Sequence, residues 1–310
     1  MNKLTTEFQN QFSNRLLFDP SVLEGIDPHA RLHEETKTHP LSSSAACLNV
    51  LGSLAHNPDG LAKFLRSFGL ELDEILEFPS PVSFGNRLYR DTGYAVFEWV
   101  GPLRSPINER GGGRGYMRTS VDVFLLGVIA GRVTQILLEW KFTEGMDRPL
   151  ALGKFCGLKG IERLRRYTPI LDELKRQADF PFDFTSEYSQ LEPGSALGIY
   201  DLSPDHLYQL LRMTLLAKKT VGMTLGKYML QDYRVVHLTH SRNDRINTLH
   251  PEYLLFSPGL QPYAGWNLHE TWKRLLAPAD REKFIPGHWD KDLLSIEDEK
   301  LKAYLVERYA

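Results

Sequence analysis

The sequence has few cysteines and no excess of either charge. Only Cys47 and Cys156 occur among 310 residues, too few for a disulfide framework and without the paired spacing of a structural zinc site. The 37 Lys and Arg residues nearly balance 39 Asp and Glu, for a net charge of −2. The chain is therefore neither a broadly basic nucleic-acid coat nor an acidic tail protein, and any site for a polyanion must be local.

Long hydrophobic runs are also missing. The longest apolar stretch, residues 123–131, stops after roughly half of the ~20 residues that a membrane helix needs. The first ten residues are polar and lack the features of a secretory signal. We therefore expect a cytoplasmic protein with no membrane partner. Because 42% of the residues are hydrophobic, the chain can form a sizeable core.

The apolar periodicity predicts an α/β fold. Two strands, residues 121–129 and 133–142, flank a stretch around Gly131 that suits a hairpin turn. Further strands are expected at 94–100 and 233–239, and helices from Ser42–Ser44 to Asn57 and over about 61–76, 158–177 and 204–221. We expect a polar extension over residues 1–40, an α/β core over 41–240, and a helical appendage over 241–310 packed on the core.

Three charged residues interrupt the apolar strands of this hairpin. Asp122 stands near the start of the first strand, and Glu139 and Lys141 stand at the end of the second. Side chains alternate along a strand, so Glu139 and Lys141 share a face, and the turn should bring Asp122 alongside Glu139. Two carboxylates 4 Å apart repel by about 4 kcal/mol at an effective dielectric of ~20. Something positive must therefore lie near them.

Lys141 supplies one positive charge, and a divalent cation could supply two more. Oxygen ligands from Asp122, Glu139 and a strand carbonyl such as that of Trp140 would favour Mg²⁺ or Mn²⁺. Such an ion would position a phosphate and lower the pKa of a bound water, while Lys141 could orient that water and stabilise developing charge. The pattern predicts metal-dependent hydrolysis of phosphodiesters.

Asp122, the interval 123–138 and Glu139-Trp140-Lys141 resemble the PD-(D/E)XK nuclease superfamily, although Val121 replaces the proline of its first motif. The resemblance implies a restriction-endonuclease-like core, with a mixed central sheet flanked by helices. It also implies that Asp122 and Glu139 hold the metal, that Lys141 assists the attacking water, and that the substrate is nucleic acid, with DNA favoured. Glu98 on the strand 94–100 is a further candidate metal ligand, and Glu35 is an alternative to it.

Candidate DNA contacts come from basic residues near these motifs. Lys159, Arg163 and Arg166 share one face of the helix expected after the hairpin, and Arg114 lies in a glycine-rich basic loop.

Several alternatives stay open. The basic helix face could simply be solvated, Glu98 could be exposed, and the three charges of the hairpin could form a structural salt bridge. The fold could serve as a nucleic-acid or protein binding module without catalysis, or the protein could be an unrelated α/β enzyme with its site elsewhere. Homodimerisation is a further open question.

Overall fold

The computed structural model describes residues 17–23, 39, 41–79, 82–84, 87–89, 93–102, 104–110, 118–145, 148–184 and 197–309. Of the residues singled out above, Glu35 and Arg114 lie outside these ranges, as does most of the expected extension over residues 1–40. No helix in the described ranges is long and apolar enough to cross a membrane.

A mixed sheet of six strands is the centre of the described fold. Strand order is β1-β5-β6-β9-β10, and β4 also pairs with β5. Strands β1, β4 and β6 each pair antiparallel with β5, whereas β9 runs parallel to β6 and β10 parallel to β9. The six strands are β1 (Glu74–Leu76), β4 (Ala95–Trp99), β5 (Val121–Ile129), β6 (Arg132–Trp140), β9 (Asp232–Thr239) and β10 (Phe284–His288).

Smaller elements surround this sheet. Two short hairpins pair β2 (Val82–Phe84) with β3 (Arg87–Tyr89) and β7 (Thr224–Leu225) with β8 (Tyr228–Met229). The α-helices are α3 (Ser43–Cys47), α4 (Pro58–Arg66), α5 (Pro149–Leu152), α6 (Gly157–Arg176), α7 (Asp205–Thr220), α8 (Asp244–Asn247), α9 (Leu268–Leu275), α10 (Pro278–Arg281) and α11 (Glu299–Tyr309). A π-helical turn, η2 (Leu48–Gly52), continues α3, and short 3₁₀ turns are η1 (Pro20–Leu23), η3 (Ile199–Leu202), η4 (Pro251–Leu254), η5 (Pro258–Tyr263) and η6 (Leu293–Ser295).

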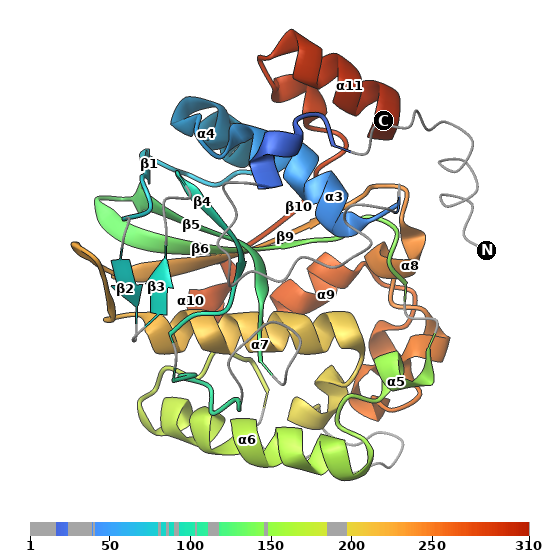
Figure 1. Ribbon diagram of the computed structural model, residues 1–310. Coiled ribbons are helices and arrows are strands. Elements are labelled where there is room, and N and C mark those ends of the chain that lie inside the picture. Colours follow the sequence, from blue (N-terminus) through green and yellow to red (C-terminus); the bar gives the residue numbers. More distant parts are fainter. Residues whose placement is uncertain are drawn as a thin grey trace.

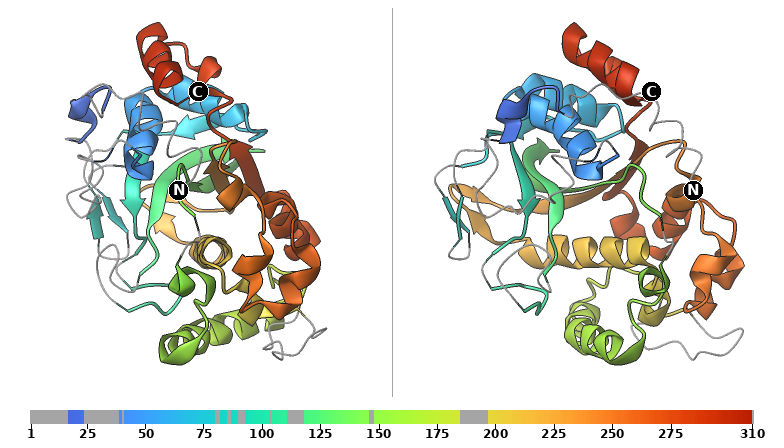
Figure 2. Two further views of the ribbon diagram at one scale, coloured as in Figure 1. Left: turned by 90° about the vertical axis from the view of Figure 1, so that its right-hand side faces the viewer. Right: turned by 45° about the vertical axis from the view of Figure 1, so that its right-hand side comes forward.

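Helices cover both faces of the sheet. Figure 1 shows α3, α4 and α11 over one face and α7 under the other, with α6 beyond α7, and the views of Figure 2 agree. The pleat of the strands divides the core accordingly. Val123 and Leu138 pack with the residues of α3 and α4, whereas Phe124 and Leu137 pack with those of α6 and α7. The predicted fold class, α/β with a mixed central sheet flanked by helices, is confirmed.

The central hairpin forms as the sequence predicts. Ile129 pairs with Arg132, so Ala130 and Gly131 make a two-residue turn. Both have positive φ, 49° for Ala130 and 72° for Gly131, as a turn that follows the right-handed twist of the strands requires.

Two predicted elements differ from the structure. The helix expected over 61–76 ends at Arg66, because Gly69 adopts a φ of 82° and Glu74–Leu76 pairs with β5 instead. The segment after residue 240 is not only helical, since it contributes β10 to the edge of the central sheet.

Candidate active site

The acidic residues occupy one row across neighbouring strands. In β5 and β6, Val123 pairs with Leu138, so the next step of the antiparallel register places Asp122 opposite Glu139. In β4 and β5, the pairs on either side of Glu98 place it opposite Asp122. Glu139 in turn pairs with His237 of β9. The sheet thus brings Glu98, Asp122 and Glu139 together, although they are up to 41 residues apart in the sequence.

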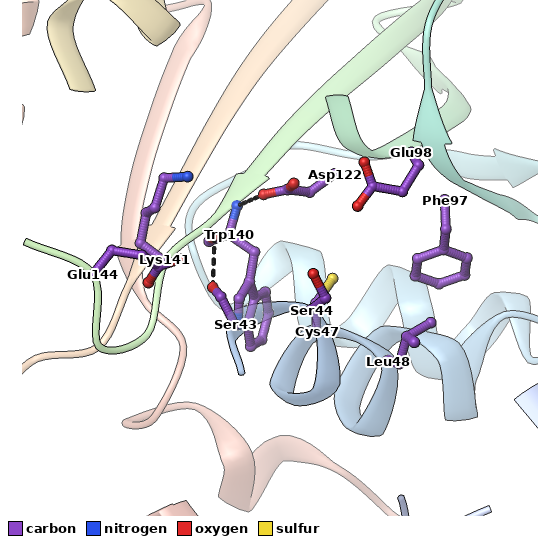
Figure 3. A pocket seen from close by; sticks show the side chains of 10 residues that line it. All are labelled: Ser43, Ser44, Cys47, Leu48, Phe97, Glu98, Asp122, Trp140, Lys141 and Glu144. Atoms are coloured by element: carbon purple, nitrogen blue, oxygen red, sulfur yellow. Dashed lines mark hydrogen bonds between the residues drawn. The ribbon is translucent and has the colours of Figure 1, made fainter. Parts of the chain in front are cut away.

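The pleat directs the catalytic candidates toward α7. Because Phe124 and Leu137 face that helix, the residues two positions away, Asp122 and Glu139, take the same face. Lys141 follows two residues after Glu139 and shares its direction. Figure 3 shows the ammonium group of Lys141 directed away from α3.

Short hydrogen bonds fix the positions of the acidic side chains and of Lys141. Asp122 Oδ2 accepts a hydrogen bond from the backbone N of Trp140 at 2.8 Å. Lys141 Nζ donates to Glu139 Oε1 at 2.6 Å, and both side chains are less than a tenth exposed. Ser120 Oγ donates to Glu98 at 2.8 Å. The sequence-based expectation that Asp122 would lie alongside Glu139 and Lys141 is therefore borne out by the geometry.

Electrostatics shows that the acids repel each other. Burial, followed by the charge of Asp122, raises the pKa of Glu139 from 4.5 to about 7, even though Lys141 acts in the opposite direction. Burial also lowers the pKa of Lys141, but the carboxylates of Glu139 and Asp122 outweigh it, and its pKa lies above the ordinary value. The neighbouring carboxylates therefore favour the charged form of Lys141, which suits a source of positive charge better than a proton acceptor.

Glu98 is held in a strained conformation. Its φ is 56°, in the left-handed region, although it stands between two paired strand residues. Such a backbone conformation is costly for a residue with a side chain and tends to persist at functional sites. Glu98 is only 5% exposed, so the alternative that it is an exposed strand acid is wrong.

Two cavities meet at this row. The larger, about 250 Å³, lies on the α7 side and is lined by Glu98, Arg118, Thr119, Ser120, Asp122, Glu139, Lys141, Gln209, Arg212 and Met213. The smaller, about 120 Å³, lies on the α3 side (Figure 3) and is lined by Ser43, Ser44, Cys47, Leu48, Phe97, Glu98, Asp122, Trp140, Lys141 and Glu144. Asp122, Glu98 and Lys141 reach both cavities. The volumes are below the ~300 Å³ of typical drug-sized pockets, and suit a small charged group.

The donors suit a hard cation that keeps some of its water. Among the described residues, no three side chains of His, Cys, Asp or Glu are arranged to hold one ion. The carbonyl of Trp140, a predicted ligand, accepts a hydrogen bond from Ser43 Oγ at 3.1 Å. Mg²⁺, however, commonly binds through one or two carboxylates together with water and substrate phosphate. The adjacent carboxylates of Asp122 and Glu139 fit that requirement, and their mutual repulsion favours a cation.

The predicted basic helix face lies apart from both cavities. Lys159, Arg163 and Arg166 are on α6, in the outer layer beyond α7, and none of them lines either cavity. Lys159 is exposed, while Arg163 is half-buried and donates to the carbonyl of Lys154 at 2.6 Å. Their contact with nucleic acid stays a prediction.

Sequence reasoning missed four residues around the site. Arg212 and Gln209 lie on α7 and line the larger cavity. Glu109 forms an ion pair with Arg212, and Cys47 of α3 lines the smaller cavity beside the acids. Burial and then the charges of Asp122, Glu98 and Glu139 raise the pKa of the Cys47 thiol. One signal was available: Arg212 is a single charge within the apolar run Leu210–Leu216.

Comparison with known protein families identifies a match to nearly the whole chain. A family model described as Restriction Endonuclease associating with ARP matches residues 18–310. Neither the curated proteins nor the solved structures gave a match.

Proposed function

Because the chain belongs to this restriction-endonuclease family, which points to a nuclease-type function, we propose that it is a metal-dependent endonuclease that hydrolyses phosphodiester bonds in DNA. The single observation that carries this proposal is the placement of Asp122 and Glu139 side by side, with Lys141 bonded to Glu139. A buried ion pair alone contributes little to stability compared with apolar packing. Two buried charges, Glu139 and Lys141, beside the partly buried Asp122 at the edge of a cavity are better explained by chemistry.

The cavity charge supports a polyanionic substrate once a cation is present. Three acidic side chains (Glu98, Asp122 and Glu139) and three basic ones (Arg118, Lys141 and Arg212) line the larger cavity, so their formal charges cancel. Mg²⁺ or Mn²⁺ held by Asp122 and Glu139, with Glu98 close by, would make the cavity positive and attract a phosphodiester. When bound, the ion would polarise the phosphate and lower the pKa of a water.

Hydrogen bonds within the protein would orient the metal-binding carboxylates, and Lys141 would stabilise the transition state. The hydrogen bond from the Trp140 backbone orients the carboxylate of Asp122, and Lys141 orients that of Glu139. The charged ammonium of Lys141 stabilises negative charge that develops on the phosphate oxygens during attack. Glu98, Glu139 and Lys141 are buried, which strengthens the electrostatic interactions among them.

Cleavage of plasmid DNA in the presence of Mg²⁺ tests this proposal. We expect cleavage that disappears in EDTA and falls by at least 10²-fold in Asp122→Asn, Glu139→Gln and Lys141→Met, since each removes a group that acts on the transition state. Glu297→Gln is the matched control, because this side chain is 76% exposed and pairs with Lys63 outside the cavities.

Three outcomes would overturn the proposal. Cleavage that persists in all three variants would place the active centre elsewhere. DNA binding without cleavage, unaffected by EDTA, would show a binding module with a nuclease-like fold. Cleavage of RNA alone would reject DNA as the substrate.

A further inference from the structure

Helix α7 presents a polar patch to the row of acids. Gln209 and Arg212 are three residues apart and therefore lie on one side of the helix. Both line the larger cavity together with Asp122, Glu139 and Lys141. The rest of this helix is mostly buried and apolar, so the two polar side chains need a reason to be there.

The guanidinium of Arg212 is held through Nε, while its two terminal nitrogens remain available to a ligand. Its Nε donates to Thr119 Oγ1 at 2.9 Å and lies 3.3 Å from Glu109 Oε1, and its guanidinium stacks 5.1 Å from the ring of Tyr208. Guanidinium has five N–H donors in a planar fork. Within the part of the chain that the structure describes, the four donors of the terminal nitrogens make no hydrogen bond. The side chain is 20% exposed, on the cavity side.

A buried network underneath holds this orientation. Glu109 is 2% exposed at its side chain and accepts hydrogen bonds from Thr119 N at 2.6 Å, Thr119 Oγ1 at 2.8 Å and Tyr167 Oη at 2.8 Å. Burial, followed by the charge of Glu109, raises the pKa of Tyr167 well above its ordinary value, so its hydroxyl keeps the proton that it donates. A carboxylate with all these donors is a rigid anchor for Arg212.

Gln209 adds a second unsatisfied group. Its Oε1 is buried and has no hydrogen-bond partner among the described residues. Native proteins leave few buried polar atoms without a partner, and such atoms often face a ligand or water. The same cavity therefore holds unused donors on Arg212 and an unused acceptor on Gln209, on the wall opposite the acids.

We propose that this face of α7 is the phosphate-binding wall of the active site: the terminal nitrogens of Arg212 bind a non-bridging phosphate oxygen of the DNA backbone, and Gln209 Oε1 accepts a hydrogen bond from a water molecule that donates its other proton to the adjoining phosphate. This inference rests on the proposed function and adds two residues that bind the phosphate backbone of the substrate. The fork of guanidinium matches phosphate in a way that ammonium cannot. The contact reads the backbone and not the bases, so it contributes equally to every sequence.

DNA binding without divalent ions tests the wall separately from catalysis. In EDTA, the affinity of the wild type for a fluorescent duplex is measured by anisotropy at several salt concentrations. Arg212→Lys keeps the charge and loses the fork, and should bind about tenfold more weakly. Arg212→Gln should also reduce the slope of log affinity against log salt by about one phosphate contact.

Two further variants keep the test decisive if the Arg212 variants fold poorly. Gln209→Glu places a negative charge on the half-buried wall, and should weaken binding at least tenfold. Arg234→Lys is the matched control, because Arg234 has a similarly covered side chain (15% exposed) but pairs with Asp232 on β9. This control should bind as the wild type does, and thermal unfolding of each variant checks its fold.

Cleavage kinetics in Mg²⁺ complete the test. A phosphate contact that acts in binding and in the transition state lowers kcat/KM in Arg212→Lys, whereas a merely structural role leaves kcat/KM of the folded fraction unchanged. Wild-type binding by Arg212→Lys, Arg212→Gln and Gln209→Glu would overturn the inference even if the nuclease activity is real. Conversely, weakened binding by these variants in a protein that never cleaves would uphold the wall and reject the proposed function.

Discussion

Replacing Glu139 by Gln should stabilise the metal-free protein above neutral pH while it removes activity. The folded structure raises the pKa of Glu139 to about 7 from 4.5, through burial and the charge of Asp122. The folded state thus holds this proton more tightly than the unfolded state does. Stability is therefore lost as pH rises from 4.5 to about 7, and the loss remains above that. The difference between the pKa values of Glu139 in the unfolded and folded states corresponds to about 3 kcal/mol of unfolding free energy.

The variant resembles the protonated form of Glu139 at every pH, so its advantage follows the same curve. Urea unfolding in EDTA should give Glu139→Gln and the wild type equal free energies of unfolding near pH 4.5, with the variant about 3 kcal/mol more stable at pH 8. Glu297→Gln should follow the wild type, because Glu297 is exposed. A Glu139→Gln variant that is less stable at pH 8 would refute the reasoning, since it would mean that attraction to Lys141 outweighs burial and repulsion from Asp122.

Two other predictions concern buried charges near the row. Lys141→Met leaves the carboxylates of Glu139 and Asp122 without their cation, and should cost about 3–5 kcal/mol of unfolding free energy at pH 8 and less at pH 5, where Glu139 takes up a proton. As a control, Lys302→Met breaks a surface ion pair of the same 2.6 Å length with Glu299, and should cost at most about 1 kcal/mol of unfolding free energy. If urea unfolding showed equal losses for Lys141→Met and Lys302→Met, the burial of the Glu139–Lys141 pair would be contradicted. Burial and then the charge of Lys141 lower the pKa of His206 to about 4, so stability present above pH 6.5 is lost as pH falls toward 4. At pH 4, His206→Leu should therefore retain up to about 3 kcal/mol more of its neutral-pH unfolding free energy than the wild type does. An acid denaturation curve identical to that of the wild type would exclude His206 as a cause of acid lability.

The sequence was most informative where local pattern and tertiary environment agree. The hairpin of β5 and β6 is specified by two apolar strands and a two-residue turn, and its register alone sets Asp122 opposite Glu139. Helices α6 and α7 were likewise predicted within one residue of their ends. Charges inside apolar strands stood out because burial makes them expensive.

Other parts of the fold depend on contacts that no local pattern reveals. Strand β10 contains Pro286 and Gly287, which normally argue against a strand, but it lies at the edge of the sheet, where parallel pairing with β9 accepts them. The anchoring of Arg212 by Glu109 joins residues 103 positions apart. Such a pair becomes visible only when α7 packs against the sheet.

Binding of Mn²⁺ tests the central claim most directly, because everything proposed depends on a cation held by Asp122 and Glu139. Titration of the metal-free protein, followed by the electron paramagnetic resonance signal of free Mn²⁺, should reveal bound ion in the wild type and in Glu297→Gln. The account predicts that Asp122→Asn and Glu139→Gln each weaken this binding at least tenfold. Wild-type affinity in both variants would contradict it, since the paired carboxylates would then not be the metal site.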